Sequence, residues 1–146
     1  MIVKTILKVI SICTSLLLGS LVGSTTIHTA FAGPTQCVMQ SGVNLCRYST
    51  REWTMYTFKG KGFSTAAAQL NKIATENIIS EKCDGTWYRI LDSGWIANYN
   101  AAYSDASTEA GFMSCQYEHF YISESWHNYY NPATSINQFE YSADGP

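Results

Sequence analysis

The sequence predicts a mainly β protein with one short helix, an α+β chain folded as a small disulfide-bonded antiparallel β-barrel or sandwich. Aromatic residues make up 14% of the 146 residues, and their large side chains favour the strands of a small core. Short apolar runs are separated by turn dipeptides such as Ser41-Gly42 and Asp84-Gly85. Four cysteines follow an N-terminal leader, which is typical of small exported domains.

The leader, residues 1–32, is predicted to be a signal peptide. Two lysines precede the apolar run Val9–Val22, and Ala30-Phe31-Ala32 fits the small-x-small rule for cleavage near Ala32. The run is too short, and too often interrupted by serine and glycine, for stable membrane insertion. We therefore expect residues 33–146 to form a single secreted, extracellular β-rich domain.

The mature chain keeps Cys37, Cys46, Cys83 and Cys115, and export favours their oxidation to two disulfides. Three connectivities are possible, and the sequence alone does not choose among them. Because the thiols are widely spaced and no Cys-x-x-Cys pair occurs, no metal site and no cofactor are predicted.

Alternating or aromatic-rich segments predict the strands in order along the chain. They are Cys37–Gln40, Val43–Tyr48, Arg51–Phe58, Trp87–Leu91, Trp95–Tyr99, Phe112–Ser123 and Phe139–Tyr141. Lys59–Gly62 is predicted to be a glycine-rich loop, and it lacks the Walker spacing of a phosphate site. Asn100–Gly111 is small and polar and is predicted to be an irregular loop.

Ser64–Asn77 is predicted to be the short helix. Ser64 can cap its N-terminus, and the alanines at positions 66–68 have high helix propensity. Leu70 and Ile73 recur at the helical period, so the segment has one narrow apolar face for packing.

Trp87–Leu91 and Trp95–Tyr99 are expected to lie side by side as a hairpin at the centre of the fold. Asp92-Ser93-Gly94 supplies the turn between them. A lone hairpin is marginally stable in water, so this one must pack against the rest of the chain. We expect at least one of the two tryptophans to lie in the core.

Three segments resemble motifs of bacterial SH3-like (SH3b) domains. Asp84–Ile90 (DGTWYRI) is similar to their dGxWykV segment, and Gly94–Tyr99 (GWIANY) is similar to their GWVxxxYL segment. Ser41–Arg47 (SGVNLCR) resembles their first strand, although Cys46 displaces the arginine. The resemblance covers about residues 37–103. It implies a small, partly open β-barrel that binds peptidoglycan peptides or other cell-envelope ligands without catalysis.

The aromatic side chains are the best binding candidates, because their faces stack on sugars or prolines and their polar atoms orient a ligand. The predicted binding residues are Trp87, Tyr88, Trp95, Tyr99, Trp126, His127, Tyr129 and Tyr130. The last four of these are predicted to form an exposed patch beside a loop.

We predict a non-catalytic binding module whose partner is a cell-wall peptide or glycan, or a surface protein. One alternative is a secreted inhibitor or toxin that acts on a protein or membrane-bound target. Trp53–Gly60 is similar to the aromatic corner of βγ-crystallin-like Greek keys, which some secreted peptidase inhibitors share. The other is a small hydrolase that uses His119 and His127 as acid and base, with Arg89 holding a phosphate.

The net charge of the chain limits the classes of partner that it can bind. The formal net charge is −2, and the chain has no basic cluster. Nucleic-acid binding depends on many lysines and arginines that neutralise phosphates, so we do not expect a nucleic-acid partner.

Overall fold

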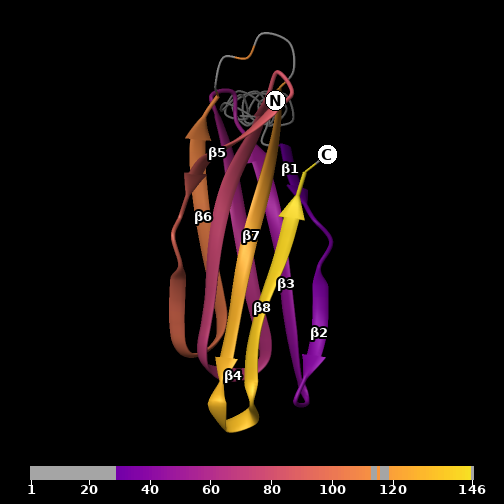
Figure 1. The fold of residues 1–146 in the computed structure, drawn as a ribbon, viewed down its shortest axis with the longest axis vertical. Helices are drawn as coiled ribbons and strands as arrows, with labels where there is room; N and C mark the ends of the chain where they lie inside the picture. The colour runs from indigo at the N-terminus through magenta and orange to yellow at the C-terminus, as the bar shows by residue number, and fades with distance from the viewer. Residues whose placement is uncertain (1–28, 113–114, 116–118, 146) are drawn as a thin grey trace, which may run out of the picture.

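The computed structural model describes residues 29–112, 115 and 119–145. Nearly all of this part of the chain is antiparallel strand, and its one helical segment is the 3-10 turn Pro132–Thr134, so the mainly β prediction is confirmed. The strands are β1 (Thr29–Ala32), β2 (Gln36–Gln40), β3 (Val43–Trp53), β4 (Thr57–Cys83), β5 (Thr86–Asp92), β6 (Ile96–Gly111), β7 (His119–Asn131) and β8 (Ile136–Asp144). Figure 1 shows that they run along the long axis of an elongated molecule.

The arrangement of the sheet depends on β4, which is long and folded back on itself. Its first part, residues 57–65, pairs with β3 and with the second half of β6. Its last part, residues 70–83, pairs with β7 on one side and with β6 and then β5 on the other. The β4–β6 register shifts between Thr65 and Leu70, where the chain turns a corner at the lower end of Figure 1. The two parts of β4 thereby lie in opposing layers.

Side chains on β3 and β8 close much of the remaining gap between the layers. The Arg47 guanidinium lies 3.0 Å from the Glu140 carboxylate and donates a hydrogen bond of 3.0 Å to the Tyr141 carbonyl. Nearer the other end, Arg51 Nε lies 3.4 Å from the Asp144 carboxylate. The result is a nearly closed barrel in which β3 and β8 meet through side chains and not through a backbone ladder.

The core has apolar clusters at its two ends. One cluster lies near the β4 corner and contains Leu45, Leu70, Ile73, Tyr129 and Ile136. The other lies near the β3–β4 turn and contains Phe58, Ile79, Ala110 and Tyr121.

Polar side chains fill the interior between these clusters. Along β7 the buried residues run from Tyr121 through Ser123, Ser125 and His127 to Tyr129. The Asn77 amide donates hydrogen bonds of 2.9 Å to the Ser123 hydroxyl and 3.0 Å to the Ser125 hydroxyl. Across the interior, the Ser49 hydroxyl on β3 lies 2.9 Å from the Ser125 hydroxyl and 2.8 Å from the Ser142 hydroxyl. Buried polar groups of this kind are stable only when they are hydrogen-bonded, and here partners come from both layers.

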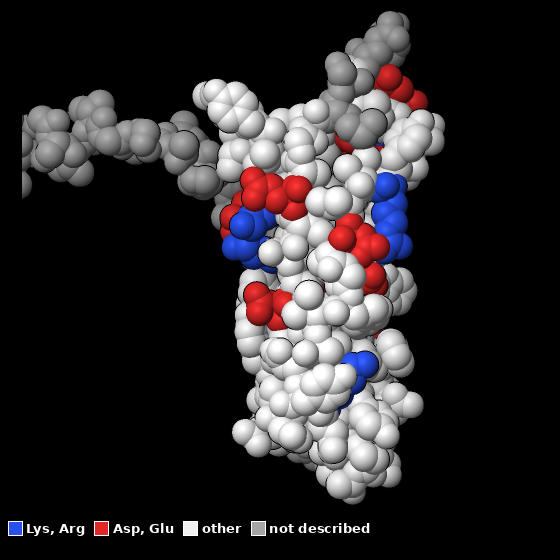
Figure 2. All heavy atoms as spheres, turned by 90° about the vertical axis from the view of Figure 1, so that its left-hand side faces the viewer, with Lys and Arg blue, Asp and Glu red and all other residues white. Residues whose placement is uncertain are grey.

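The predicted loop at Lys59–Gly62 is wrong, because these residues lie within β4. Gly60 faces inward, and a Cβ added there would lie 2.7 Å from Asn77 Oδ1. Glycine therefore lets the two layers approach across the polar interior. The alternate residues face outward, and Lys61 lies 3.1 Å from the Glu52 carboxylate. Figure 2 shows acidic and basic side chains next to one another on the side of the molecule that it presents.

The predicted helix at Ser64–Asn77 is also wrong, since β4 runs through the whole segment. Helix propensity at the alanines is a weak preference, worth a fraction of a kcal/mol per residue. Ile73, Thr75 and Asn77 instead alternate into the interior, while the backbone of residues 72–75 pairs with both β6 and β7. Two ladders and the core contacts outweigh the local preference.

The expected central hairpin is wrong in its pairing. Asp84-Gly85 is a tight turn with φ of 50° and 88°, but it joins β5 to the end of β4. β5 and β6 do not pair with each other, because they follow one another along the same edge of β4. Both tryptophans are about half exposed, Trp87 by 50% and Trp95 by 44%, so neither lies in the core.

Further boundaries differ from the prediction. The strand predicted at Val43–Tyr48 extends to Trp53, and the one predicted at Arg51–Phe58 is wrong, because it spans the turn between β3 and β4. Asn100–Gly111 belongs to β6 and is not a loop. The strand predicted at Phe112–Ser123 begins only at His119 and continues to Asn131, where Pro132 ends it. The predicted last strand is confirmed and is longer, as β8.

Both predicted disulfides are present, and the structure resolves their connectivity. Cys37 is bonded to Cys46 across the β2–β3 ladder, and Cys83 is bonded to Cys115. Most of the predicted signal peptide lies outside the described residues, so its cleavage stays a prediction. Its last residues, Thr29–Ala32, form β1 and pair with residues 50–53 of β3.

Candidate binding surfaces

The outer surface of the layer formed by β8, β7 and the last part of β4 carries exposed aromatic rings. On β7 and β8 these rings alternate with the buried residues of each strand, which places them on one face. Trp87 and Tyr99 pair with Lys82 and Lys72 of β4, and the Trp95 ring contacts that of Phe139. We call this surface the outer aromatic face, and its members are Trp87, Trp95, Tyr99, Trp126, Tyr130, Phe139 and Tyr141. The Trp126 and Tyr141 ring centroids lie 5.1 Å apart, and those of Trp95 and Phe139 lie 6.2 Å apart.

Most predicted binding residues lie on this surface, but not all. Tyr88 is exposed and pairs with Glu81, which places it on the opposite face of β5 from Trp87. His127 and Tyr129 have no exposed surface, so the predicted patch at 126–130 is wrong for these two residues. The physical reason is strand alternation, which sends Trp126 and Tyr130 outward and His127 and Tyr129 into the barrel.

A depression of about 250 Å³ opens on the outer aromatic face, lined by Ser80, Trp87, Ile122 and Glu124. The Ser80 hydroxyl donates to one oxygen of the Glu124 carboxylate, and the Tyr141 hydroxyl donates to the other over 2.9 Å. Burial and the Glu124 carboxylate raise the pKa of Tyr141 to about 12, so its hydroxyl remains a donor at neutral pH. The carboxylate is thus held in one orientation beside the Trp87 ring.

Arg89 lies on the same side of the molecule and has two carboxylate partners. It lies 2.6 Å from Asp92 and 3.6 Å from Glu76. A hydrogen bond from the Gly94 backbone N–H lowers the pKa of Asp92, and Arg89 lowers it further. Burial raises the pKa of Glu76, and the neighbouring Asp92 adds to that shift.

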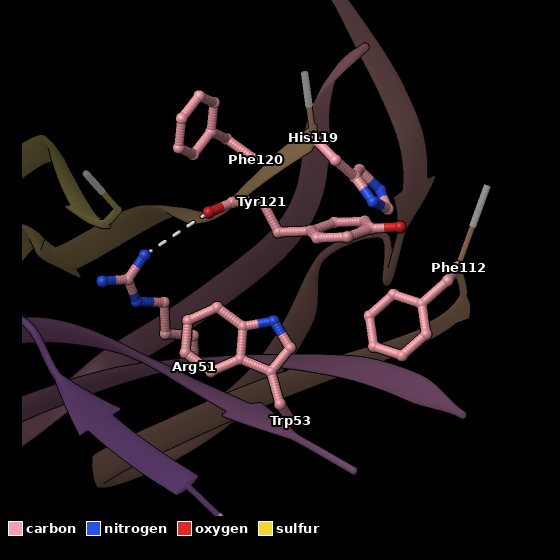
Figure 3. A pocket seen from close by; sticks show the side chains of 6 residues that line it. All are labelled: Arg51, Trp53, Phe112, His119, Phe120 and Tyr121. Atoms are coloured by element: carbon pink, nitrogen blue, oxygen red, sulfur yellow. Dashed lines mark hydrogen bonds between the residues drawn. The ribbon is translucent and has the colours of Figure 1, made fainter. Parts of the chain in front are cut away.

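A second pocket, also about 250 Å³, lies at the end of the barrel near the β3–β4 turn (Figure 3). It is lined by Arg51, Trp53, Phe112, His119, Phe120 and Tyr121. The Arg51 guanidinium lies 4.9 Å from the Trp53 ring centroid, and it donates to the Tyr121 carbonyl over 3.5 Å. The pocket therefore has aromatic walls with one guanidinium and one imidazole.

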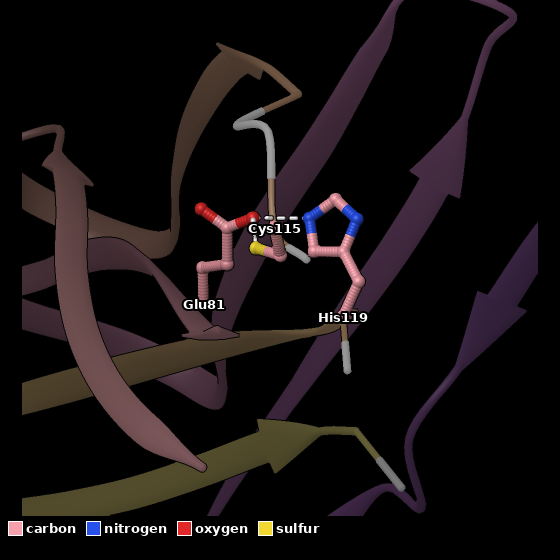
Figure 4. A group of neighbouring side chains, drawn as sticks. All are labelled: Glu81, Cys115 and His119. Atoms are coloured by element: carbon pink, nitrogen blue, oxygen red, sulfur yellow. Dashed lines mark hydrogen bonds and ion pairs between the residues drawn. The ribbon is translucent and has the colours of Figure 1, made fainter. Parts of the chain in front are cut away.

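The His119 imidazole contacts the Glu81 carboxylate beside this pocket (Figure 4). Glu81 is fully buried, and its second oxygen has no hydrogen-bond partner among the described residues. His127 lies eight residues further along β7, which corresponds to about 26 Å of strand. The predicted acid–base pair of His119 and His127 does not form, and Arg89 lies near neither imidazole.

Sequence reasoning missed Glu124, Ser80 and Glu81. Glu124 could have been found from alternation, since it lies two residues before the exposed Trp126 on one strand face. Ser80 and Glu81 had no such signal, because only the pairing of β4 with β7 brings them to these sites.

No family model, no curated protein and no solved structure matches this chain. The SH3b resemblance therefore stays a prediction. Within the described residues, helices long and apolar enough to cross a membrane are absent.

Proposed function

We propose that this protein is a secreted, non-catalytic binding module that binds cell-envelope glycans on its outer aromatic face. The observation that carries the proposal is the exposed Trp87 ring next to the oriented Glu124 carboxylate in one depression. A tryptophan ring offers a flat apolar platform to the C–H face of a sugar ring. A carboxylate accepts hydrogen bonds from sugar hydroxyls. The proposal rests on this surface and not on a hairpin of paired tryptophan strands.

Glu124 retains the capacity to accept ligand hydrogen bonds. Each carboxylate oxygen can accept about two hydrogen bonds, and here each accepts one, from Ser80 or from Tyr141. Because these donors already hold the carboxylate, a ligand would lose little affinity to side-chain ordering.

The remaining rings of the outer aromatic face support an extended ligand. Trp126 and Phe139 are exposed by 43% and 65%, and they stand on neighbouring strands. Several exposed aromatic rings gathered on one face, two pairs of them in contact, are typical of binding sites. A chain of several sugars can contact these rings in succession, which adds affinity beyond that of one sugar.

The experiment is retention of the mature protein on isolated cell walls, followed by titration with soluble cell-wall oligosaccharides. We expect W87A and E124Q each to weaken binding at least tenfold, which corresponds to about 1.4 kcal/mol. Y56A is the matched control, because Tyr56 is an aromatic residue even more exposed than Trp87, 75% against 50%, and lies on the β3–β4 turn. Failure of the wild-type protein to bind, or full binding by both W87A and E124Q, would contradict the proposal.

One observation favours the inhibitor or toxin alternative. The β3–β4 turn projects Met55 and Tyr56, which are exposed by 80% and 75%. The Thr54 hydroxyl accepts hydrogen bonds from the backbone N–H groups of Tyr56 and Thr57, at 3.2 and 2.9 Å. The conformation of the turn is therefore stabilised by its own hydrogen bonds. A rigid turn that carries large apolar side chains is well suited to bind a pocket on a protein partner. Loss of biological activity in M55A/Y56A, with glycan binding intact, would support this alternative.

A further inference from the structure

A sulfur atom, a carboxylate and an imidazole, from Cys115, Glu81 and His119, come together where β4 and β7 pair at the end of the barrel (Figure 4). Glu81 and Cys83 lie two residues apart on β4 and share its inner face. His119 is the direct cross-strand partner of Cys83, and the disulfide places Cys115 beside them. The donor atoms of Glu81, Cys115 and His119 all lie within 4.8 Å of one another.

The distance between these ligand atoms fits a small metal ion with tetrahedral coordination. Cys115 Sγ lies 3.6 Å from Glu81 Oε1. Zinc–sulfur and zinc–oxygen bonds of about 2.3 and 2.0 Å, at a tetrahedral angle, separate the two ligand atoms by about 3.5 Å. The disulfide sulfur carries no proton, so this contact is not a hydrogen bond in the oxidised protein.

The Glu81 carboxylate supplies an independent indication. It has no exposed surface, and its Oε2 atom has no hydrogen-bond partner among the described residues. A buried carboxylate is costly unless a cation or several donors compensate its charge. The His119 imidazole approaches only the other oxygen, Oε1.

We propose that Glu81, Cys83, Cys115 and His119 bind Zn²⁺ when the Cys83–Cys115 disulfide is reduced. With the disulfide intact, only the carboxylate and the imidazole are good ligands, which is fewer than the three or four that zinc sites use. Reduction supplies the two missing thiolates. The same four residues would then exist in two exclusive states, a disulfide or a zinc centre.

The chemistry balances with a reductant of the thiol or phosphine class. Two thiols donate two electrons and two protons to the Cys83–Cys115 bond and become a disulfide themselves. A phosphine donates the same two electrons and becomes a phosphine oxide, with its oxygen atom and the two protons supplied by one water molecule. Zn²⁺ then forms bonds to both cysteine sulfurs, and the two thiol protons pass to solvent. Bound zinc lowers the reactivity of both sulfurs, so it opposes alkylation and renewed oxidation.

The second disulfide is an internal control within the same molecule. Cys37 and Cys46 pair across the β2–β3 ladder, and neither belongs to a group of potential metal ligands among the described residues, whereas Cys115 does and Cys83 is bonded to it. The full chain is reduced with a phosphine without oxygen, mixed with one equivalent of Zn²⁺ or Mg²⁺, and alkylated. Mass spectrometry then gives the alkylation rate at each cysteine, and circular dichroism checks that the strands persist.

We expect Zn²⁺ to slow alkylation of Cys83 and Cys115 at least tenfold, while Cys37 and Cys46 react as they do with Mg²⁺. E81Q, which keeps the shape of the side chain, and H119A should each remove most of this protection. The proposal is overturned if zinc protects none of the four cysteines or all four alike. It is also overturned if protection is unchanged in both E81Q and H119A.

Discussion

The Nδ1 atom of His127 lies 2.8 Å from the Ser64 hydroxyl oxygen, in the middle of the barrel and out of contact with solvent. Its Nε2 atom lies 2.7 Å from the hydroxyl of Ser142. The imidazole therefore joins a strand of one layer to a strand of the other while it remains neutral. Burial lowers the pKa of His127 to about 3, and the nearby Arg47 charge contributes to the shift.

This shift predicts that His127 makes the fold sensitive to acid. The unfolded chain takes up the proton near pH 6.5, whereas the folded protein resists it until about pH 3. The stabilisation is therefore complete above about pH 6.5 and is lost as the pH falls toward 3. The full effect is about 4–5 kcal/mol, from 1.36 kcal/mol per pKa unit.

Urea unfolding of the wild-type protein and H127Q between pH 7 and pH 4 measures this effect. Glutamine can still donate and accept hydrogen bonds but does not titrate, so the stability difference between the two proteins should shrink as the pH falls. A difference that stays constant with pH would contradict the neutral, buried state of His127. Comparing the two proteins removes the contribution of carboxylates that they share.

Gly62 is predicted to tolerate no side chain. A Cβ at this position would lie 2.6 Å from Ser125 Cβ in the opposing layer. We expect G62A to lower the free energy of unfolding by about 1–3 kcal/mol, as is usual for overpacked interiors. G111A is the matched control, because a Cβ there has no atom within 4 Å. Equal unfolding midpoints for the two variants would contradict the close approach of the layers.

The ion pair between Arg47 and Glu140 is predicted to hold β3 to β8. Both side chains are largely buried, with 14% and 20% of their surfaces exposed. R47M leaves the carboxylate without its partner and should cost about 3 kcal/mol or more. The double variant R47M/E140Q should recover much of this loss, because neither charge is then buried alone. A complete double-mutant cycle by urea unfolding tests this, and additive single effects would count against the contact.

The two disulfides are predicted to differ in their contribution to stability. Cys83 and Cys115 are 32 residues apart, whereas Cys37 and Cys46 are 9 apart. The entropy of loop closure makes the longer link worth about 1 kcal/mol more. Thermal unfolding of C83S/C115S and C37S/C46S shows which disulfide contributes more to stability. Non-reducing peptide mapping of the wild-type protein should find only these two disulfides. A larger loss in C37S/C46S would contradict the entropic account.

Local turn chemistry was the most informative part of the sequence. Ser41-Gly42 and Asp84-Gly85 both adopt positive φ angles at turns between paired strands, because glycine and short polar residues reach that conformation at low cost. On one side of each turn the flanking strand was not found with its bounds, since β3 is longer than predicted and β4 was predicted as a loop and a helix. On the other side, β2 and β5 were found within one residue. Their backbone partners lie close in sequence, so local information is sufficient.

The binding surface was predicted only in part. Trp87, Trp95 and Trp126 were identified as binding candidates from their residue type, and all three are exposed. Glu124 was not identified, because its role depends on the fixed orientation of its carboxylate. That orientation is set by hydrogen bonds from Ser80 and Tyr141, which lie on two other strands. Glu81 and His119 likewise meet only through the pairing of β4 with β7.

By itself the sequence determined the strand-rich class, the tight turns and the presence of two disulfides, since each follows from residue type and near neighbours. Tertiary structure alone decided that β4 folds back on itself and that β5 and β6 share one of its edges. It also decided which face of β7 is buried. Alternation separates Trp126 from His127, and apolar character would favour burial of the tryptophan. Hydrogen bonds with Ser64 of the opposing layer and with Ser142 of the neighbouring strand β8 instead make the interior favourable for His127, and this energy arises only when both layers are in place.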